Sequence, residues 1–181
     1  PLGHPDTPVL ELASALFAGS YQSRLSTQLR ETLPLVFSAE GGFWFAPGFG
    51  AWSFSVSATR EQLPKVLDLV ESQWAGWLGP NGGPTPEALE QARRRLLGGL
   101  PLLTTTLESQ VSRDLLTWRF GLPENVWSER ARRLESATAQ QVRAAITRWW
   151  KPDQTIWILA GPKNTLETAV RSRASWKQAR F

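Results

Sequence analysis

The sequence predicts an α+β fold in which an antiparallel sheet packs against helices on one of its faces. Apolar residues recur at helical spacing through most of the chain, whereas two β-prone runs, at 35–46 and 49–58, flank a Pro-Gly turn. A third apolar run, TIWILA at 155–160, follows the last helical pattern. The predicted order is therefore two helices, a hairpin, four helices and a strand.

The first two helices are predicted from apolar residues spaced three or four apart. Residues 8–18 (PVLELASALFA) carry such a stripe, and Gly19 then ends or bends the helix. Residues 21–32 continue helically with leucines four residues apart. Pro34 stops this second helix, because a proline ring disfavours helical geometry in the residue before it.

The hairpin is predicted from its turn and from alternation along its second strand. Pro47-Gly48 supplies the turn between the two runs. The second run alternates large apolar residues with small or polar ones, the large ones being Trp52, Phe54 and Val56. Gly41-Gly42 inside the first run suggests a bulge or a bend.

Four further helices are predicted at 60–78, 85–97, 105–120 and 138–149. Thr85 before Pro86 is an N-cap followed by a proline at the first helical position. Threonine followed three residues later by glutamine predicts two capping boxes, Thr59–Gln62 and Thr138–Gln141. In the third of these helices four residues are expected to face the core: Leu107, Val111, Leu115 and Trp118.

The hairpin is rich in aromatic residues, and they cannot all face one side. They are Phe43, Trp44, Phe45, Phe49, Trp52 and Phe54. Because side chains alternate between the two faces of a strand, about half of them must point away from any one layer of helices. That second face is covered either by other helices of this chain or by another domain, since a large exposed apolar patch marks an interface.

The composition excludes several kinds of site. The 181 residues include no cysteine, no methionine and one histidine, His4, so neither a thiolate site nor an HxxEH zinc motif exists here. A Ser-His-Asp triad would need His4 from the terminus, which is disfavoured. The net charge of +4 is modest, and the basic clusters, RRR at Arg93–Arg95 and the C-terminal tail, are interpreted as solvated faces rather than a nucleic-acid site. No apolar run approaches the roughly 20 residues that span a bilayer.

Four stretches in order resemble motifs of one family, the M16 (insulinase or mitochondrial-processing-peptidase-like) metallopeptidases. They are GSYQSRLSTQLRETLPLVFS, TPEALEQARRRLLGGLPL, TTTLESQVSRDLLTWRFGLPENVW and ATAQQVRAAITRWWKPDQTIWILAGP. The resemblance covers about residues 8–162. It implies a LuxS/MPP-like metallohydrolase type of fold and, because HxxEH is missing, the non-catalytic C-terminal half of such an enzyme.

The resemblance also implies a function and a substrate-binding pair. An HxxEH-bearing domain or subunit would hold the zinc, and this half, without metal or catalytic residues of its own, would enclose and position peptide substrates. In active members an arginine and a tyrosine seven residues later hold the substrate. The matching residues here are Arg30 and Phe37, and phenylalanine lacks the hydroxyl. Alternatively, Arg30 is a solvated or salt-bridged helix residue, Phe37 packs into the sheet, and the chain is a scaffold or assembly subunit.

Three segments are expected from this reading. Residues 1–7 would be a mobile N-terminus or a cloning remnant, residues 8–162 the M16 C-terminal-like domain, and residues 163–181 a basic tail. The composition fits a bacterial periplasm and a cytoplasm equally, and nothing in it selects among the signal presequences, small peptides and cofactor precursors that family members cut.

Overall fold

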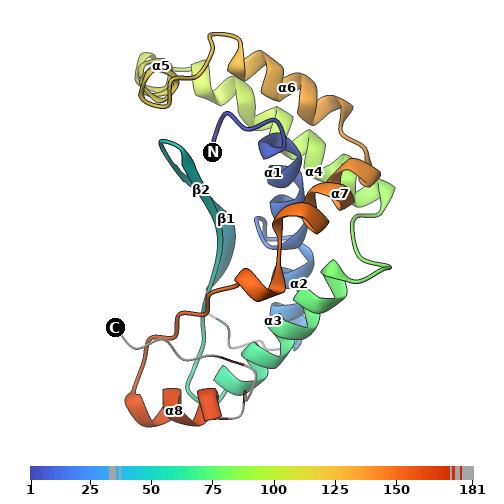
Figure 1. The fold of residues 1–181 in the computed structure, drawn as a ribbon, viewed down its shortest axis with the longest axis vertical. Helices are drawn as coiled ribbons and strands as arrows, with labels where there is room; N and C mark the ends of the chain where they lie inside the picture. Colours follow the sequence, from blue (N-terminus) through green and yellow to red (C-terminus); the bar gives the residue numbers. More distant parts are fainter. Residues whose placement is uncertain (33–35, 37, 172, 174–175, 177–181) are drawn as a thin grey trace.

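The computed structural model describes residues 1–32, 36, 38–171, 173 and 176. Its helices and strands are α1 (Thr7–Phe17), α2 (Arg24–Thr32), β1 (Ser38–Ala46), β2 (Phe49–Ser57), α3 (Leu63–Leu78), α4 (Pro86–Gly99), α5 (Leu107–Arg119), α6 (Val126–Ser136), α7 (Ala139–Trp149) and α8 (Lys163–Arg171). Short 3-10 turns, η1 (Leu100–Thr104) and η2 (Pro152–Gln154), follow α4 and α7. The predicted α+β architecture is confirmed: the hairpin runs along one side of a layer of helices (Figure 1).

Helix α1 is the centre of the structure. It contacts β1 on one side and α2, α4, α6 and α7 on the others, and nine of its residues are buried. Phe17, the last residue of the helix, is only 1% exposed. Its ring centroid lies 5.3 to 6.0 Å from the ring centroids of four tryptophans, Trp52, Trp74, Trp77 and Trp150. Those separations are typical of favourable aromatic pairs, so this cluster joins the hairpin to α1, α3 and the end of α7.

The strands β1 and β2 pair antiparallel without interruption, from Ser38 opposite Ser57 to Ala46 opposite Phe49. Gly48 has a φ of +74°, which a non-glycine residue rarely adopts. The bulge suggested at Gly41-Gly42 is absent from this continuous ladder. Gly41 instead allows close packing, because a Cβ there would lie 2.7 Å from the Cβ of Ala18.

Two further local predictions were wrong, and one helix was missed. The Thr59–Gln62 capping box does not form, because α3 begins only at Leu63 and Gln62 at its N-cap makes no side-chain bond. Residues 155–160 are not a strand, since no described strand lies close enough to exchange hydrogen bonds with them. Helix α6 was not predicted, because its sequence SERARR obscures an apolar face that holds the fully buried Leu134.

The predicted inward face of α5 is also wrong. Leu107, Val111, Leu115 and Trp118 are between 49% and 82% exposed. The helix lies beyond the tip of the hairpin, at the top of Figure 1, and it contacts mainly the adjoining η1. Its apolar stripe is therefore real, but no described element covers it. The Thr85 N-cap and the Thr138–Gln141 capping box are confirmed.

Candidate functional site

Arg30 lies in the last turn of α2, where the chain turns towards β1. Its guanidinium carbon sits 3.3 Å from the centroid of the Tyr21 ring, and this ring is 76% exposed. A guanidinium stacked on a ring keeps its N–H groups in its own plane, where they remain available to an acceptor. Among the described residues, none forms a hydrogen bond or an ion pair with Arg30, so Tyr21 alone holds the cation in place.

The two arginines of this segment have different surroundings. The Nε of Arg24 donates a hydrogen bond of 2.8 Å to Oε1 of Gln73 and thereby links α2 to α3. Arg24 therefore has a structural role. Within the described part of the chain, Arg30 has no comparable link. Sequence reasoning missed Tyr21, although the residue stood at the start of the same motif, because it lies in the turn before the helix rather than on it.

Phe37 lies outside the described residues, as does Pro34. The structure therefore gives no position for the second member of the predicted pair. A substrate-holding role for Arg30 and Phe37 stays a prediction, and the described geometry contributes only the stack of half-buried Arg30 on exposed Tyr21.

The face of the hairpin turned away from α1 is open and almost free of charge. Its side chains are small or hydroxylic along most of the ladder, as in the opposed pairs Ser38–Ser57 and Gly42–Ser53. Glu40 is the single charged residue of both strands. Near the turn, Trp44 and Phe49 stack with ring centroids 5.3 Å apart, and each is about half exposed. Such a face, flat along its length and aromatic at its tip, suits contact with another polypeptide.

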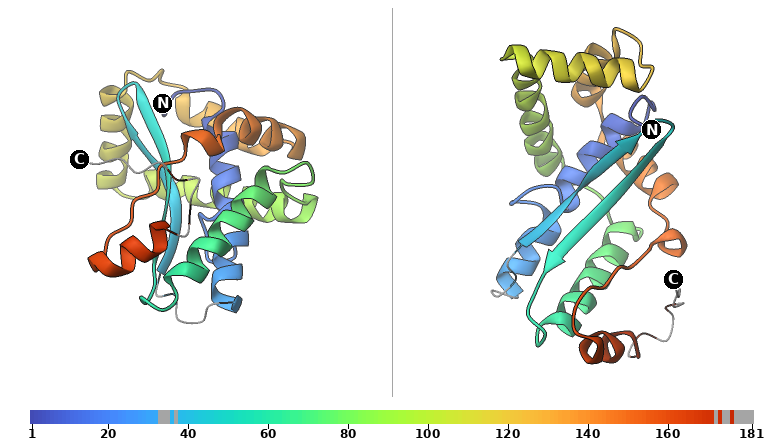
Figure 2. Two further views of the ribbon diagram at one scale, coloured as in Figure 1. Left: turned by 60° about the horizontal axis from the view of Figure 1, so that its bottom comes forward. Right: turned by 90° about the vertical axis from the view of Figure 1, so that its left-hand side faces the viewer.

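Aromatic residues on the opposite face point towards the helices. Phe43, Phe45 and Trp52 are half-buried, and together with Trp149 and Trp150 they line a small hollow beside the N-terminus. The expected division of the aromatic cluster between two faces is thus confirmed. Helices of this chain cover one face, as the turned views of Figure 2 show, and the other carries Trp44 and Phe49.

The described residues hold no group of three or more His, Asp or Glu side chains that could bind a metal ion. His4 accepts a hydrogen bond from the backbone N–H of Asp6 and packs edge-on against Trp149 at 5.0 Å. The pKa of Asp6 is lowered, first by the Trp149 indole N–H that donates to it at 2.7 Å, and also by Arg148. These groups fasten the N-terminus to α7 and lie away from the open face.

The basic cluster at Arg93–Arg95 is bound within the chain. Arg93 pairs with Glu90 and donates to backbone carbonyls before α7, and Arg94 pairs with Glu90 as well. Arg94 and Arg93 lower the pKa of that carboxyl. Arg95 donates to the carbonyl of Gly19 at 2.7 Å. No helix in the described part of the chain combines the length and apolarity needed to cross a bilayer.

Comparisons with known proteins point to one family. Residues 1–96 match the family model described as the peptidase M16 inactive domain. The peptidase M16 inactive domain from Pseudomonas fluorescens is similar in structure, with a TM-score of 0.70 and 24% identity over 81% of this chain. This chain spans about a third (34%) of that protein.

Two further solved structures share the fold. The inactive peptidase domain of a protein assigned as a zinc protease from Bordetella parapertussis has a TM-score of 0.72 at 19% identity, over 84% of this chain and 81% of that one. A conserved protein from Enterococcus faecalis V583 has a TM-score of 0.64 at 16% identity, over 81% and 33%. No curated protein matches the sequence.

Proposed function

The chain belongs to the peptidase M16 inactive-domain family, and from this premise we propose that it is the non-catalytic half of an M16-type zinc metallopeptidase. It would pair with a domain or subunit that carries HxxEH, and the two would enclose peptide substrates. The partner would hold the zinc, which supplies an activated water. The observation that carries this proposal is the open face of the hairpin, uncharged except for Glu40 and bordered by half-exposed Trp44 and Phe49.

Within this proposal Arg30 would position substrate. Its stack on Tyr21 fixes the guanidinium at the surface while its N–H groups remain available to a peptide carbonyl or carboxylate. Phe37 would contribute an apolar contact in place of the hydrogen bond that a tyrosine could make. Positioning of the peptide would therefore depend mainly on the arginine.

The test reconstitutes the chain with its HxxEH-bearing partner and measures peptide cleavage. A hydrogen bond to a charged group contributes about 1.5–3 kcal/mol, so Arg30→Ala is expected to lower kcat/KM by about 10- to 150-fold. Tyr21→Ala should produce part of that loss, because the guanidinium loses its support. Phe37→Tyr should raise kcat/KM. Arg94→Ala, which removes an arginine 79% exposed on α4, is the matched control and should change nothing.

The chain alone should neither bind zinc stoichiometrically nor cleave peptides. Metal analysis of the purified chain checks this directly, and one tightly bound zinc per chain would contradict the proposal.

A scaffold or assembly subunit with no direct part in proteolysis is the second candidate. The phenylalanine at position 37 favours it, since the hydroxyl needed for the second substrate contact is missing. Under this alternative, Arg30→Ala leaves kcat/KM of the reconstituted enzyme unchanged, whereas loss of the whole chain abolishes assembly. The same reconstitution therefore separates the two functions.

A further inference from the structure

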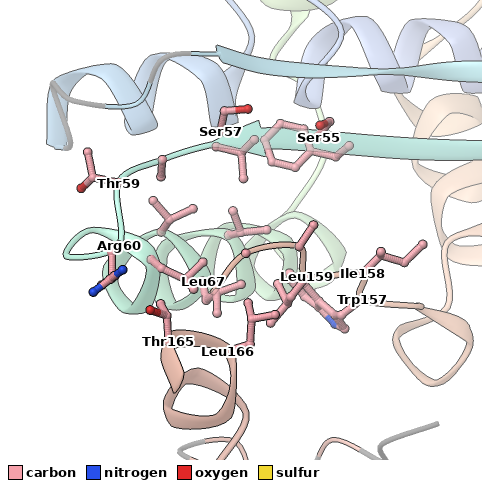
Figure 3. Close-up of a pocket in the computed structure, with 18 of the residues that line it drawn as sticks. Ser55, Ser57, Thr59, Arg60, Leu67, Trp157, Ile158, Leu159, Thr165 and Leu166 are labelled. Carbon is pink, nitrogen blue, oxygen red and sulfur yellow. The ribbon is translucent and has the colours of Figure 1, made fainter. Parts of the chain in front are cut away.

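Three arginines form neither a hydrogen bond nor an ion pair within the described residues, and they are Arg30, Arg60 and Arg119. Figure 3 shows Arg60 at one end of the groove beside β2, and no aromatic ring of the described residues holds its guanidinium. Arg119 approaches the ring of Phe120 only to 6.0 Å. Arg30 is the one that stacks closely, at 3.3 Å from the ring centroid of Tyr21. This cation is therefore held in place and still available to a ligand.

The Tyr21 ring adds a hydroxyl to this cation. Tyr21 is 76% exposed, and no described residue forms a hydrogen bond with its hydroxyl. The guanidinium sits over the centre of the ring, and the hydroxyl lies at the rim of the same ring. The N–H groups of Arg30 therefore lie in one plane and the phenol O–H in the next, so that both donors can reach the two oxygens of one ligand group. A phenylalanine at this position would supply the ring without the second donor.

The turn that carries Tyr21 is fastened to its surroundings. The N–H of Gly19 and the hydroxyl of Ser20 donate to backbone carbonyls of α1, at 2.6 and 3.2 Å. Arg95 of α4 donates to the carbonyl of Gly19 at 2.7 Å. Ser23, only 2% exposed, donates to the carbonyl of Ser20 at 2.6 Å and closes the turn before α2. The backbone that presents the phenol is thus held before a ligand arrives, which lowers the entropic cost of binding.

The charge of this pair favours a carboxylate as the ligand. None of the described carboxylates pairs with Arg30. Glu31 follows it directly, but consecutive residues of a helix do not face each other. A hydrogen bond between a charged donor and an ionised acceptor is roughly twice as strong as one between neutral groups. A carboxylate therefore gains more here than a peptide carbonyl, and its two oxygens can accept from the guanidinium and the phenol separately.

We propose that the Tyr21 hydroxyl and the Arg30 guanidinium together bind a carboxylate of the peptide substrate. The inference rests on the proposed function, in which Arg30 contacts the peptide, and it adds a second contacting residue and a substrate class. Tyr21 is then a ligand-binding residue and not only the support of the arginine. The carboxylate belongs to the C-terminus of the peptide or to an acidic side chain, since both present the same two oxygens.

The first experiment measures peptide binding by NMR, with Tyr21 as the reporter because it is the single tyrosine of the chain. Acetylated oligoalanine peptides are compared that end in a free carboxylate or in an amide, and amidated ones that carry a central aspartate or asparagine. A carboxylate-bearing peptide should shift the ring signals of Tyr21 and saturate at millimolar concentration, whereas the neutral amide and the asparagine peptide should not. Response to the free acid alone assigns the C-terminus, and response to the aspartate peptide assigns the side chain. Equal responses to all four peptides, or none, would overturn the proposal.

Tyr21→Phe is the decisive variant, because it keeps the ring beneath the arginine and removes only the hydroxyl. Binding to this variant is followed through the Nε–H signal of Arg30. Loss of one hydrogen bond from a neutral donor is expected to weaken carboxylate binding by about 2- to 12-fold. Arg94→Ala is the control for general charge effects and should leave binding unchanged. Unaltered affinity in Tyr21→Phe would show that the ring alone suffices and would overturn the inference.

Cleavage by the reconstituted enzyme separates failure of this inference from failure of the proposed function. Tyr21→Phe should lower kcat/KM by the same factor for peptides that carry the carboxylate and leave it unchanged for their neutral counterparts. If Arg30→Ala lowers kcat/KM while Tyr21→Phe has no effect on any substrate, only the hydroxyl contact is refuted. If neither variant changes kcat/KM, the substrate-positioning function fails together with the inference.

Discussion

Helices α1 and α5 each carry an apolar stripe but differ completely in burial. Helix α1 has nine buried residues and contacts five other elements, whereas α5 has no buried residue. Helix α1 carries one charged residue and α5 carries four, and an apolar stripe contributes free energy only where another surface removes it from water. The comparison shows that this chain holds a dense centre around α1 and Phe17, and a periphery whose apolar surfaces remain uncovered by the described residues.

The largest effect is expected at the centre. Phe17→Ala removes the ring that four tryptophans surround, and a buried Phe→Ala change typically costs about 3–5 kcal/mol of unfolding free energy. Leu115→Ala on α5, where the side chain is 58% exposed, should cost less than about 0.5 kcal/mol. Urea unfolding of both variants measures the contrast, and equal losses would refute the division into centre and periphery.

A smaller effect is expected where α1 meets the hairpin. Gly41→Ala places a methyl group 2.7 Å from the Cβ of Ala18, and overpacking of this kind costs about 1–3 kcal/mol. Gly42→Ala is the neighbouring control, because nothing lies within 4 Å of the position its Cβ would occupy. If denaturant midpoints for the two variants coincide, the close packing of β1 on α1 is not a determinant of stability.

Helix caps provide a third, local contrast. Thr138→Ala removes the hydroxyl that accepts from the N–H of Gln141, whereas the backbone N–H of Thr138 can still donate to Oε1 of Gln141. Loss of such a cap costs about 1 kcal/mol. Thr59→Ala, in the box that does not form, should cost almost nothing. Thermal unfolding of the two variants checks the ranking, and a larger loss for Thr59→Ala would contradict the described start of α3.

The smallest effect concerns pH. Because the folded protein lowers the pKa of Asp6 below its ordinary value of 3.8, the ionised carboxylate stabilises the fold at neutral pH. That contribution is fully present above the ordinary pKa and is lost as the pH falls through the lowered one. Asp6→Asn should therefore lower the free energy of unfolding at pH 7. The difference in unfolding free energy between this variant and the wild type should shrink as the pH falls below about 4. A gap that stays constant with pH would show that Asp6 does not act through its charge.

The sequence predicted those features that neighbouring residues determine. The Pro47-Gly48 turn, the Thr85 cap and the Thr138 box each depend on chemistry within a few residues, and all are present. It failed locally at the Thr59–Gln62 box, where α3 begins later than predicted, and otherwise where burial or pairing depends on distant elements. The inward face of α5 and the strand at 155–160 require partners that a local pattern cannot supply.

The candidate site divides in the same way. Arg30 was identified through a motif, and the helix predicted at 21–32 places it in the last turn of α2, where the structure has it. Its stack on Tyr21 was not predicted, because the contact depends on how the turn before α2 folds back over the last turn of that helix. Phe37 stays a prediction. The open hairpin face was expected from the strand period, since alternation alone requires that some aromatic residues point outward.

The position of α1 has a consequence for synthesis on the ribosome. The helix ends at Phe17, but α7, which covers one of its faces, begins only at Ala139. At about 5–20 residues per second, α7 is made roughly 6–24 s after α1. During this interval the stripe around Leu12 and Phe17 has hairpin, α3 and α4 as possible cover but not α7. The face of α1 that α7 covers is thus the part of this helix that waits longest for its cover.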